Sequence, residues 1–177
     1  MLTMPNFRLL TQLGEKVISV WALVGGLFLL SVVILNIGSI IGSIVLIHVP
    51  GDFELTQIGV AVAIFCFLPY CQLHRYNVTA DIFTFWANNK TILLLRIGGA
   101  GVALLFSILL LWRMTDGMLD QKKYDYTTAI LQFPVWIGFI PILISLCLLA
   151  MASIMTIIQE LSSDTDGVIP NDSGHRP

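Results

Sequence analysis

Apolar and polar residues alternate along this chain in blocks, with long apolar runs separated by short polar segments. The four longest runs free of Asp, Glu, Lys and Arg are residues 17–51, 55–74, 97–112 and 126–159. A helix needs about 20 apolar residues to cross the ~30 Å hydrocarbon core of a bilayer. The pattern therefore predicts four transmembrane helices, at about residues 17–47, 54–73, 91–114 and 133–158.

The fold class that follows is an all-α integral membrane protein with a single domain. The four spans and their connections occupy residues 1–161, which leaves too little chain for a separate soluble domain. Residues 162–177 are polar and include Gly and Pro, so we expect a disordered tail. The first apolar run is far longer than the ~7–15-residue core of a signal peptide, so we expect it to remain as a membrane anchor.

The segment between the second and third predicted spans has a different pattern. Placed on a helix, residues 77–90 form an apolar face from Val78, Ile82, Phe85 and Trp86 and a polar face from Asn77, Asp81, Thr84 and Asn88. This pattern is typical of an amphipathic helix that lies in the membrane surface. A helix packed against a partner protein has the same pattern, and the sequence leaves both interpretations open.

The composition agrees with a membrane location and argues against several functions. Hydrophobic residues make up 56% of the chain and charged residues 11%, against about 25% charged residues in soluble domains. The net charge is −2 and the sequence has no basic patch, so we expect no binding to nucleic acid. Cys66, Cys71 and Cys147 belong to apolar runs and form no C-x-x-C pair, which favours packing over a disulfide or a metal site.

The distribution of Lys and Arg predicts how the chain is oriented in the membrane. With four spans, one side carries Arg8, Lys16, Arg75, Lys90, Arg96 and Arg176. The other side carries Arg113, Lys122 and Lys123. Lys and Arg are enriched on the cytoplasmic side, so we expect both termini in the cytoplasm. The turn at Asp52 and a predicted polar loop at Arg113–Asp125 would then face outward.

The spans carry few of the residues that catalysis or cofactor binding requires. Haem groups in helical bundles need histidines inside the spans, whereas His48 and His74 lie at span ends and His175 lies in the tail. The sequence has no phosphate-binding loop, no reactive cysteine pair and no pair of carboxylates inside a span. We therefore predict no catalytic residue, no cofactor site and no metal site, and a protein that is not an enzyme.

Glu54 is the one candidate for a proton-carrying carboxylate. It lies at the mouth of the second span, directly after Pro50-Gly51-Asp52-Phe53. Three roles are open: a favourable charge at a helix N-terminus, an ion pair with a partner protein, or a proton carrier. The third role would make this chain a self-contained, small, homo-oligomeric proton-coupled transporter, which is the alternative to a subunit of a larger transporter.

Small residues are concentrated in parts of the first and third spans. Gly38 and Gly42 are four residues apart and therefore share one face of a helix. Gly98 and Gly101 belong to the stretch Gly-Gly-Ala-Gly at the start of the third span. Small side chains allow membrane helices to approach one another closely. We expect these four glycines to pack against a neighbouring helix.

Several short motifs resemble those of one known family. They are Gly51-Asp52-Phe53-Glu54-Leu55, Phe67-Leu68-Pro69-Tyr70-Cys71-Gln72-Leu73 and Asn77-Val78-Thr79-Ala80-Asp81-Ile82-Phe83-Thr84. With the four-span layout and Phe133-Pro134-Val135-Trp136 at the start of the fourth span, they resemble the small membrane (Q-type) subunit of tripartite ATP-independent periplasmic (TRAP) transporters. One departure is Tyr76, which stands where a Gly often precedes the Asn of the third motif.

The resemblance implies a function and a set of partners. Such a subunit works in the bacterial inner membrane with a large membrane subunit, which carries substrate and sodium ions, and with a soluble periplasmic substrate-binding protein. The small subunit acts as a static scaffold, and the substrates are mostly organic anions such as carboxylates or sulfonates. We accordingly expect sodium ions in the large subunit and no cofactor in this chain.

The resemblance and the residue pattern together define a set of candidate contacts with partner subunits. These residues are Glu54, His74, Arg75, Asn77, Asp81, Gly38, Gly42, Gly98 and Gly101. Charges buried at an interface are costly unless they are paired. We therefore expect the charged members of this set to pair across or near the interface with the large subunit.

Overall fold

The computed structural model describes residues 5–44, 50–74 and 89–165. These residues contain four α-helices, namely α1 (Pro5–Ile44), α2 (Asp52–Leu73), α4 (Asn89–Lys123) and α5 (Trp136–Thr165). All four are long and apolar enough to cross a membrane, which confirms the predicted all-α, four-span fold. The predicted surface helix at 77–90 lies outside the described residues except for Asn89 and Lys90, which begin α4.

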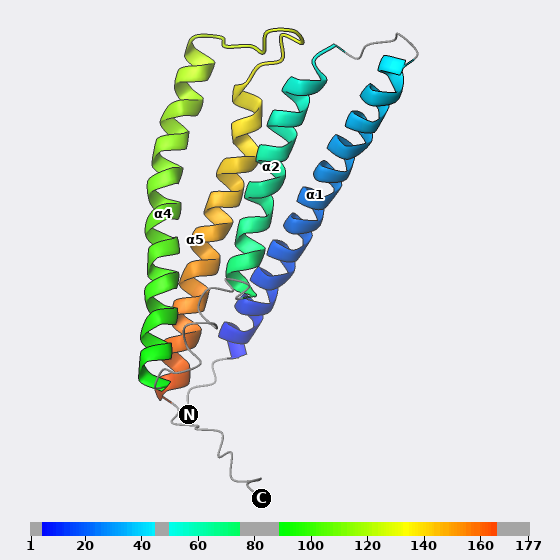
Figure 1. The fold of residues 1–177 in the computed structure, drawn as a ribbon. Helices are drawn as coiled ribbons and strands as arrows, with labels where there is room; N and C mark the ends of the chain where they lie inside the picture. The colour runs from blue at the N-terminus through cyan, green and yellow to red at the C-terminus, as the bar shows by residue number, and fades with distance from the viewer. Residues whose placement is uncertain (1–4, 45–49, 75–88, 166–177) are drawn as a thin grey trace, which may run out of the picture.

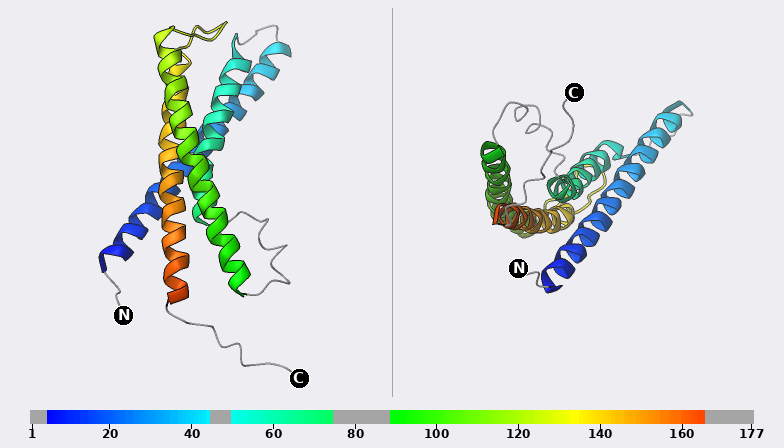
Figure 2. Two further views of the ribbon diagram at one scale, coloured as in Figure 1. Left: turned by 90° about the vertical axis from the view of Figure 1, so that its left-hand side faces the viewer. Right: turned by 90° about the horizontal axis from the view of Figure 1, so that it is seen from below.

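The helices form a curved row rather than a closed bundle, as Figure 2 shows. α2 packs between α1 and α5, and α5 packs between α2 and α4, so the order across the row is α1, α2, α5, α4. We call the end at which α1 begins and α5 ends the tail end (Figure 1). At the opposite end, α2 begins and residues 124–135 connect α4 to α5; we call this the loop end.

The helices are longer than the spans that the sequence predicts. α1 has 40 residues and α4 has 35, which corresponds to about 60 Å and 52 Å. Both lengths exceed the ~30 Å hydrocarbon core, and α1 is strongly inclined to α4 and α5 (Figure 2). The predicted polar loop at 113–125 is helical as far as Lys123, where Lys122 and Lys123 suit a helix C-terminus.

The last helix is displaced toward the C-terminus relative to the predicted fourth span. α5 begins at Trp136 because residues 133–135 belong to the connection from α4, where the Val135 N–H donates to the Tyr126 carbonyl. α5 ends at Thr165, so the first four residues of the predicted tail are helical. The remainder of that tail lies outside the described residues.

The core lies along the contact between α2 and α5. One cluster of buried residues consists of Val62, Cys66, Ile142, Leu146 and Leu149. A second cluster, nearer the tail end, consists of Ile18, Leu73, Leu148 and Ala152. Trp21 of α1 packs against both. Lipid tails are as apolar as these side chains, so close van der Waals packing is the main force that holds the helices together.

Two glycines bring α1 and α2 into close contact. A Cβ atom at Gly25 of α1 would overlap Cys66 of α2, and a Cβ atom at Gly59 of α2 would overlap Val32 of α1. Any larger residue at either position would force the helices apart. We call this contact, defined by Gly25, Val32, Gly59 and Cys66, the α1–α2 seam.

Large apolar side chains cover the outside of the row. Leu23 and Leu27 of α1 and Leu94 and Trp112 of α4 are all more than 60% exposed. A soluble monomer rarely exposes apolar surface on this scale. Lipid tails or the helices of a partner protein are the surroundings that suit it.

Candidate functional site

Glu54 lies in the first turn of α2, at the loop end, against the connection between α4 and α5. The Ile130 N–H donates to Glu54 Oε1 at 2.9 Å, and the Leu131 N–H donates to Glu54 Oε2 at 3.2 Å. We call these two hydrogen bonds the Glu54 clamp. The two carboxylate oxygens thus accept the N–H groups of two consecutive residues, one each. Hydrogen bonds to an ionised carboxylate are stronger than those between neutral groups.

Gly51 allows the connection to come this close to α2. It is the N-cap residue of the helix and has φ = 79°, a left-handed conformation that favours glycine. A Cβ atom at Gly51 would also overlap the side chain of Leu131. Glycine is therefore required at this position both by the backbone conformation and by the contact with Leu131.

Residues 124–135, which we call the 124–135 loop, have a defined backbone structure. The Val135 N–H donates to the Tyr126 carbonyl at 3.1 Å, and the Thr128 N–H donates to the Phe133 carbonyl at 2.9 Å. The Thr128 hydroxyl oxygen accepts the Phe133 N–H at 3.1 Å. These bonds close the loop on itself, and the Glu54 clamp attaches it to α2.

Aromatic and basic side chains gather where the loop joins its two helices. The Lys122 ammonium lies 5.3 Å from the centre of the Trp136 ring, and the Lys123 ammonium lies 5.5 Å from that of Tyr124. Both distances are within the range of a cation–π interaction. The end of α4 and the start of α5 are thus linked through side chains as well as through the backbone.

Polar side chains also connect α1 to the start of α2. The Asn36 amide donates to the Thr56 hydroxyl at 2.9 Å, and the Ser39 hydroxyl donates to the Asp52 carboxylate. Such contacts between membrane helices contribute about 0.6–2 kcal/mol each. The first turns of α2 are therefore held on one side by α1 and on the other by the 124–135 loop.

Three of the four glycines that the sequence analysis selected differ from those that pack within the chain. Gly38 of α1 and Gly98 and Gly101 of α4 face open space, with no described neighbour within 4 Å of an added Cβ atom. Gly42 is half-buried. The expected close packing is therefore not made at these three positions within the described chain, and contact with a partner subunit stays a prediction.

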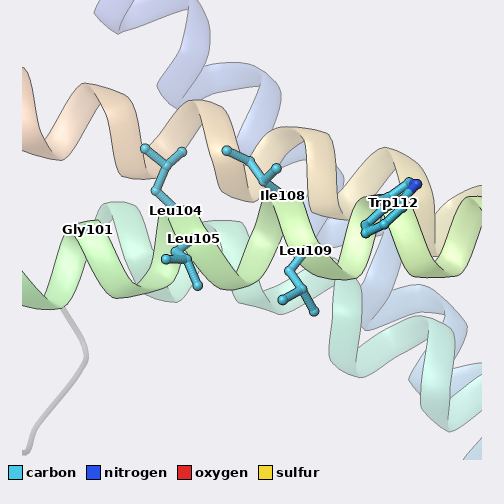
Figure 3. A pocket seen from close by; sticks show the side chains of 6 residues that line it. All are labelled: Gly101, Leu104, Leu105, Ile108, Leu109 and Trp112. Atoms are coloured by element: carbon cyan, nitrogen blue, oxygen red, sulfur yellow. The ribbon is translucent and has the colours of Figure 1, made fainter.

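One face of α4 lines a shallow apolar hollow, shown in Figure 3. Its volume is about 530 Å³. The lining residues are Gly101, Leu104, Leu105, Ile108, Leu109 and Trp112. This hollow continues the uncovered glycine face of α4, and its aliphatic lining suits an apolar helix or a lipid chain.

His74, another of the predicted contact residues, lies far from Glu54. His74 follows the last turn of α2 at the tail end, where its ring stacks on Tyr70 with 4.1 Å between ring centres. Its Nδ1 lies 3.2 Å from the Tyr70 carbonyl oxygen. α2 has 22 residues, which at 1.5 Å per residue separates its ends by about 33 Å. Arg75, Asn77 and Asp81 lie outside the described residues.

Two features of this end of the molecule are missing from the sequence analysis. The donors of the Glu54 clamp are backbone N–H groups of Ile130 and Leu131, which leave no mark in a sequence. The contact of Asn36 with Thr56 had a visible signal, because Asn36 is an isolated amide within the charge-free run 17–51. An amide in such a run favours a polar partner on another helix.

The comparisons with known proteins give one family. Residues 35–163 match the sequence model described as "Tripartite ATP-independent periplasmic transporters, DctQ component". No curated protein and no solved structure matches. The matched range begins just before Asn36 and includes the 124–135 loop, all of α2 and α4, and nearly all of α5. The chain therefore belongs to the DctQ family, the small membrane subunits of TRAP transporters, which is a family of transporter components and not of enzymes.

Proposed function

We propose that this chain is the static scaffold subunit of a sodium-driven, binding-protein-dependent importer of organic anions such as carboxylates or sulfonates. In this proposal the large membrane subunit carries the substrate and the sodium ions. The soluble binding protein delivers the substrate from the periplasm. This chain holds the moving parts of the large subunit in place and carries no cofactor.

The single observation that carries the proposal is the open row of helices in a member of this family. α4 packs along α5 within the chain, and the described residues leave its Gly98–Gly101 face and apolar hollow uncovered. Small residues that face open space in a membrane helix favour a second helix at close distance. A large polytopic partner would supply that helix.

The polar groups of the spans support a structural role. Asn36 bonds Thr56, and Trp21 bonds Ser145, so that these groups connect helices of the same chain. The Ser153 and Thr156 hydroxyls each donate to the carbonyl four residues earlier in α5. A substrate path needs polar groups that are available to a solute, whereas these groups form hydrogen bonds within or between the helices of this chain.

The orientation that we propose places both termini in the cytoplasm of a cell with an inner membrane. The distribution of Lys and Arg supports it, with six residues on the tail-end side and three on the loop-end side. The loop end, with Glu54 and the 124–135 loop, then faces the periplasm. His74, Arg75, Asn77 and Asp81 belong to the cytoplasmic side, where we propose contacts with the large subunit.

The test is reconstitution of defined combinations of the three proteins in liposomes. We expect uptake of a radiolabelled carboxylate only when this chain, the large subunit and the binding protein are all present with an inward sodium gradient. A tag on this chain should recover the large subunit at a one-to-one ratio. Omission of sodium or of either partner is the control.

The alternative, a self-contained proton-coupled transporter, gives the opposite results in the same assay. The chain would purify alone as a stable homo-oligomer and would take up substrate in response to a proton gradient. Substitution of Glu54 by Gln would then abolish that uptake, because the carboxylate would have to bind and release the proton. Proton-driven uptake by this chain alone, or its loss on substitution of Glu54, would overturn the scaffold proposal.

A further inference from the structure

The 124–135 loop projects well beyond the apolar part of α4. Arg113 is the first charged residue after the charge-free run 97–112, and α4 continues from it to Lys123. Ten residues of helix rise about 15 Å, whereas the headgroup layer on each side of the core is about 5–8 Å thick. In a membrane whose hydrocarbon core ends near Arg113, the tip of α4 and the loop that follows reach beyond the lipid headgroups into water.

The loop has a fixed shape although it lies at the surface. Asp125 and Gln132 have φ angles of 48° and 50°, which turn the backbone at both of its ends. Thr127 and Pro134 pair with each other in an antiparallel bridge. Left-handed backbone is rare for residues other than glycine and persists only where the surroundings hold it. At Asp125 the Tyr126 N–H donates to the Gln121 carbonyl at 3.1 Å, which closes the end of α4. Next to Gln132, the Glu54 clamp and the contact of Leu131 with Gly51 hold the loop from outside.

The loop presents large side chains to its surroundings. Tyr124 is 62% exposed, Tyr126 55% and Ile130 61%. Tyrosine is enriched where proteins bind one another, because it combines apolar area with one hydroxyl and few rotatable bonds. Tyrosine is also common at the headgroup level of membranes, but contact with fluid lipid gains little from a fixed backbone. Binding to a folded protein becomes tighter when the loop has a fixed backbone, because a loop that is already ordered loses less conformational entropy on binding.

We propose that the Glu54 clamp holds the 124–135 loop in the shape that contacts the soluble substrate-binding protein of this transporter. The inference rests on the proposed function, which places the loop end in the periplasm. Glu54 is then a positioning residue: it touches neither substrate nor the binding protein, and it acts through the backbone of Ile130 and Leu131. In this role Glu54 keeps its two hydrogen bonds to the loop throughout transport.

The experiment measures binding of the purified binding protein to the complex of this chain and the large subunit in nanodiscs. Glu54→Gln keeps the size of the side chain but leaves one acceptor oxygen for two N–H donors. We expect it to weaken binding about tenfold, as loss of a charge-assisted hydrogen bond does. Co-purification with the large subunit should not change. Uptake should need about tenfold more binding protein for half-maximal rate and reach the same maximum.

Two further variants test the loop and the specificity of the effect. Thr128→Val removes the acceptor for the Phe133 N–H inside the loop and also the contact of the Thr128 hydroxyl with the Glu54 carboxylate, and we expect weaker binding in the same direction. Gln57→Ala changes an exposed residue one turn further along α2 and should bind like the unsubstituted complex. Unchanged binding by both Glu54→Gln and Thr128→Val would overturn the proposal.

A cysteine introduced at Ala129, which is exposed in the loop, tests separately whether the loop lies in water and contacts the binding protein. A water-soluble maleimide should label it in the nanodisc complex, and the binding protein should protect it. Failure to label in the absence of the binding protein would place the loop in lipid and refute the proposal. If the unsubstituted chain did not assemble with the large subunit, the proposed function itself would fail, which is a distinct result.

Discussion

The α1–α2 seam and the outer face of α4 are both rich in glycine, yet the chain uses them differently. At the seam, Gly25 and Gly59 lie against side chains of the opposite helix so closely that a Cβ atom does not fit. On α4, Gly98 and Gly101 have no described neighbour within that reach. A cluster of small residues therefore indicates close packing but does not tell whether the partner helix belongs to the same chain.

The largest effect should come from filling the seam. Gly59→Leu places a side chain where Val32 already lies, and overpacking of a tight contact costs about 1–3 kcal/mol or more. We expect loss of the monodisperse peak of a fluorescent fusion in detergent. Gly38→Leu on α1, which fills open space, is the matched control and should behave like the unsubstituted chain. Equal profiles for the two variants would contradict the seam.

The next effect should appear only in the presence of the large subunit. Gly101→Leu adds a side chain to the uncovered face of α4, and we expect the thermal midpoint of the isolated chain to stay within about 2 °C, as for an ordinary surface substitution. Recovery of the large subunit on the tagged chain should fall several-fold. A clear drop in the midpoint of the isolated chain would show instead that this face is packed internally.

A smaller effect should follow from removing the polar tie next to the seam. Asn36→Leu deletes the hydrogen bond to Thr56, which keeps its own bond to the Asp52 carbonyl. We expect a loss of about 0.6–2 kcal/mol, measured as a lower midpoint of thermal unfolding. In a double-mutant cycle, Thr56→Val should cost little more once Asn36 is replaced. Full additivity of the two substitutions would show that the side chains do not interact.

The smallest effect should be seen at Trp21. Trp21→Phe removes the donor to Ser145, while the Ser145 hydroxyl keeps its bond to the Pro141 carbonyl. The aromatic ring that packs against both core clusters is largely retained. We expect a loss below about 1.5 kcal/mol and a small decrease in the thermal midpoint. Trp21→Ala should cost much more, because it also removes the packing.

The distribution of charge along the sequence was sufficient to predict the four helices. A stretch such as 55–74 has few stable alternatives in lipid, since every backbone polar group must be bonded within the segment. The ends of α4 were less predictable. Residues 113–123 are polar enough for a loop, whereas in the structure they continue α4 as far as Lys123.

The order of the helices and the contacts of Glu54 could not be predicted in the same way. Whether Gly59 or Gly101 meets another helix depends on how each helix is rotated and tilted, and the weak periodicity of membrane helices does not fix this. The sequence did mark Glu54 as a residue to explain. Its partners, however, are backbone N–H groups 76 and 77 positions away, and every non-proline residue offers the same group.

The order of the row also has a consequence for how the chain is made. α1 with α2, and α4 with α5, are consecutive pairs that contact each other directly, whereas the contact between α2 and α5 joins distant parts of the chain. During synthesis the first pair can close its seam early, while the side chains of α1 and α2 that pack on α5 meet their partners only when α5 is inserted. Insertion thus has a natural halfway state, in which one helical hairpin is formed and its contacts with the second hairpin are still to be made.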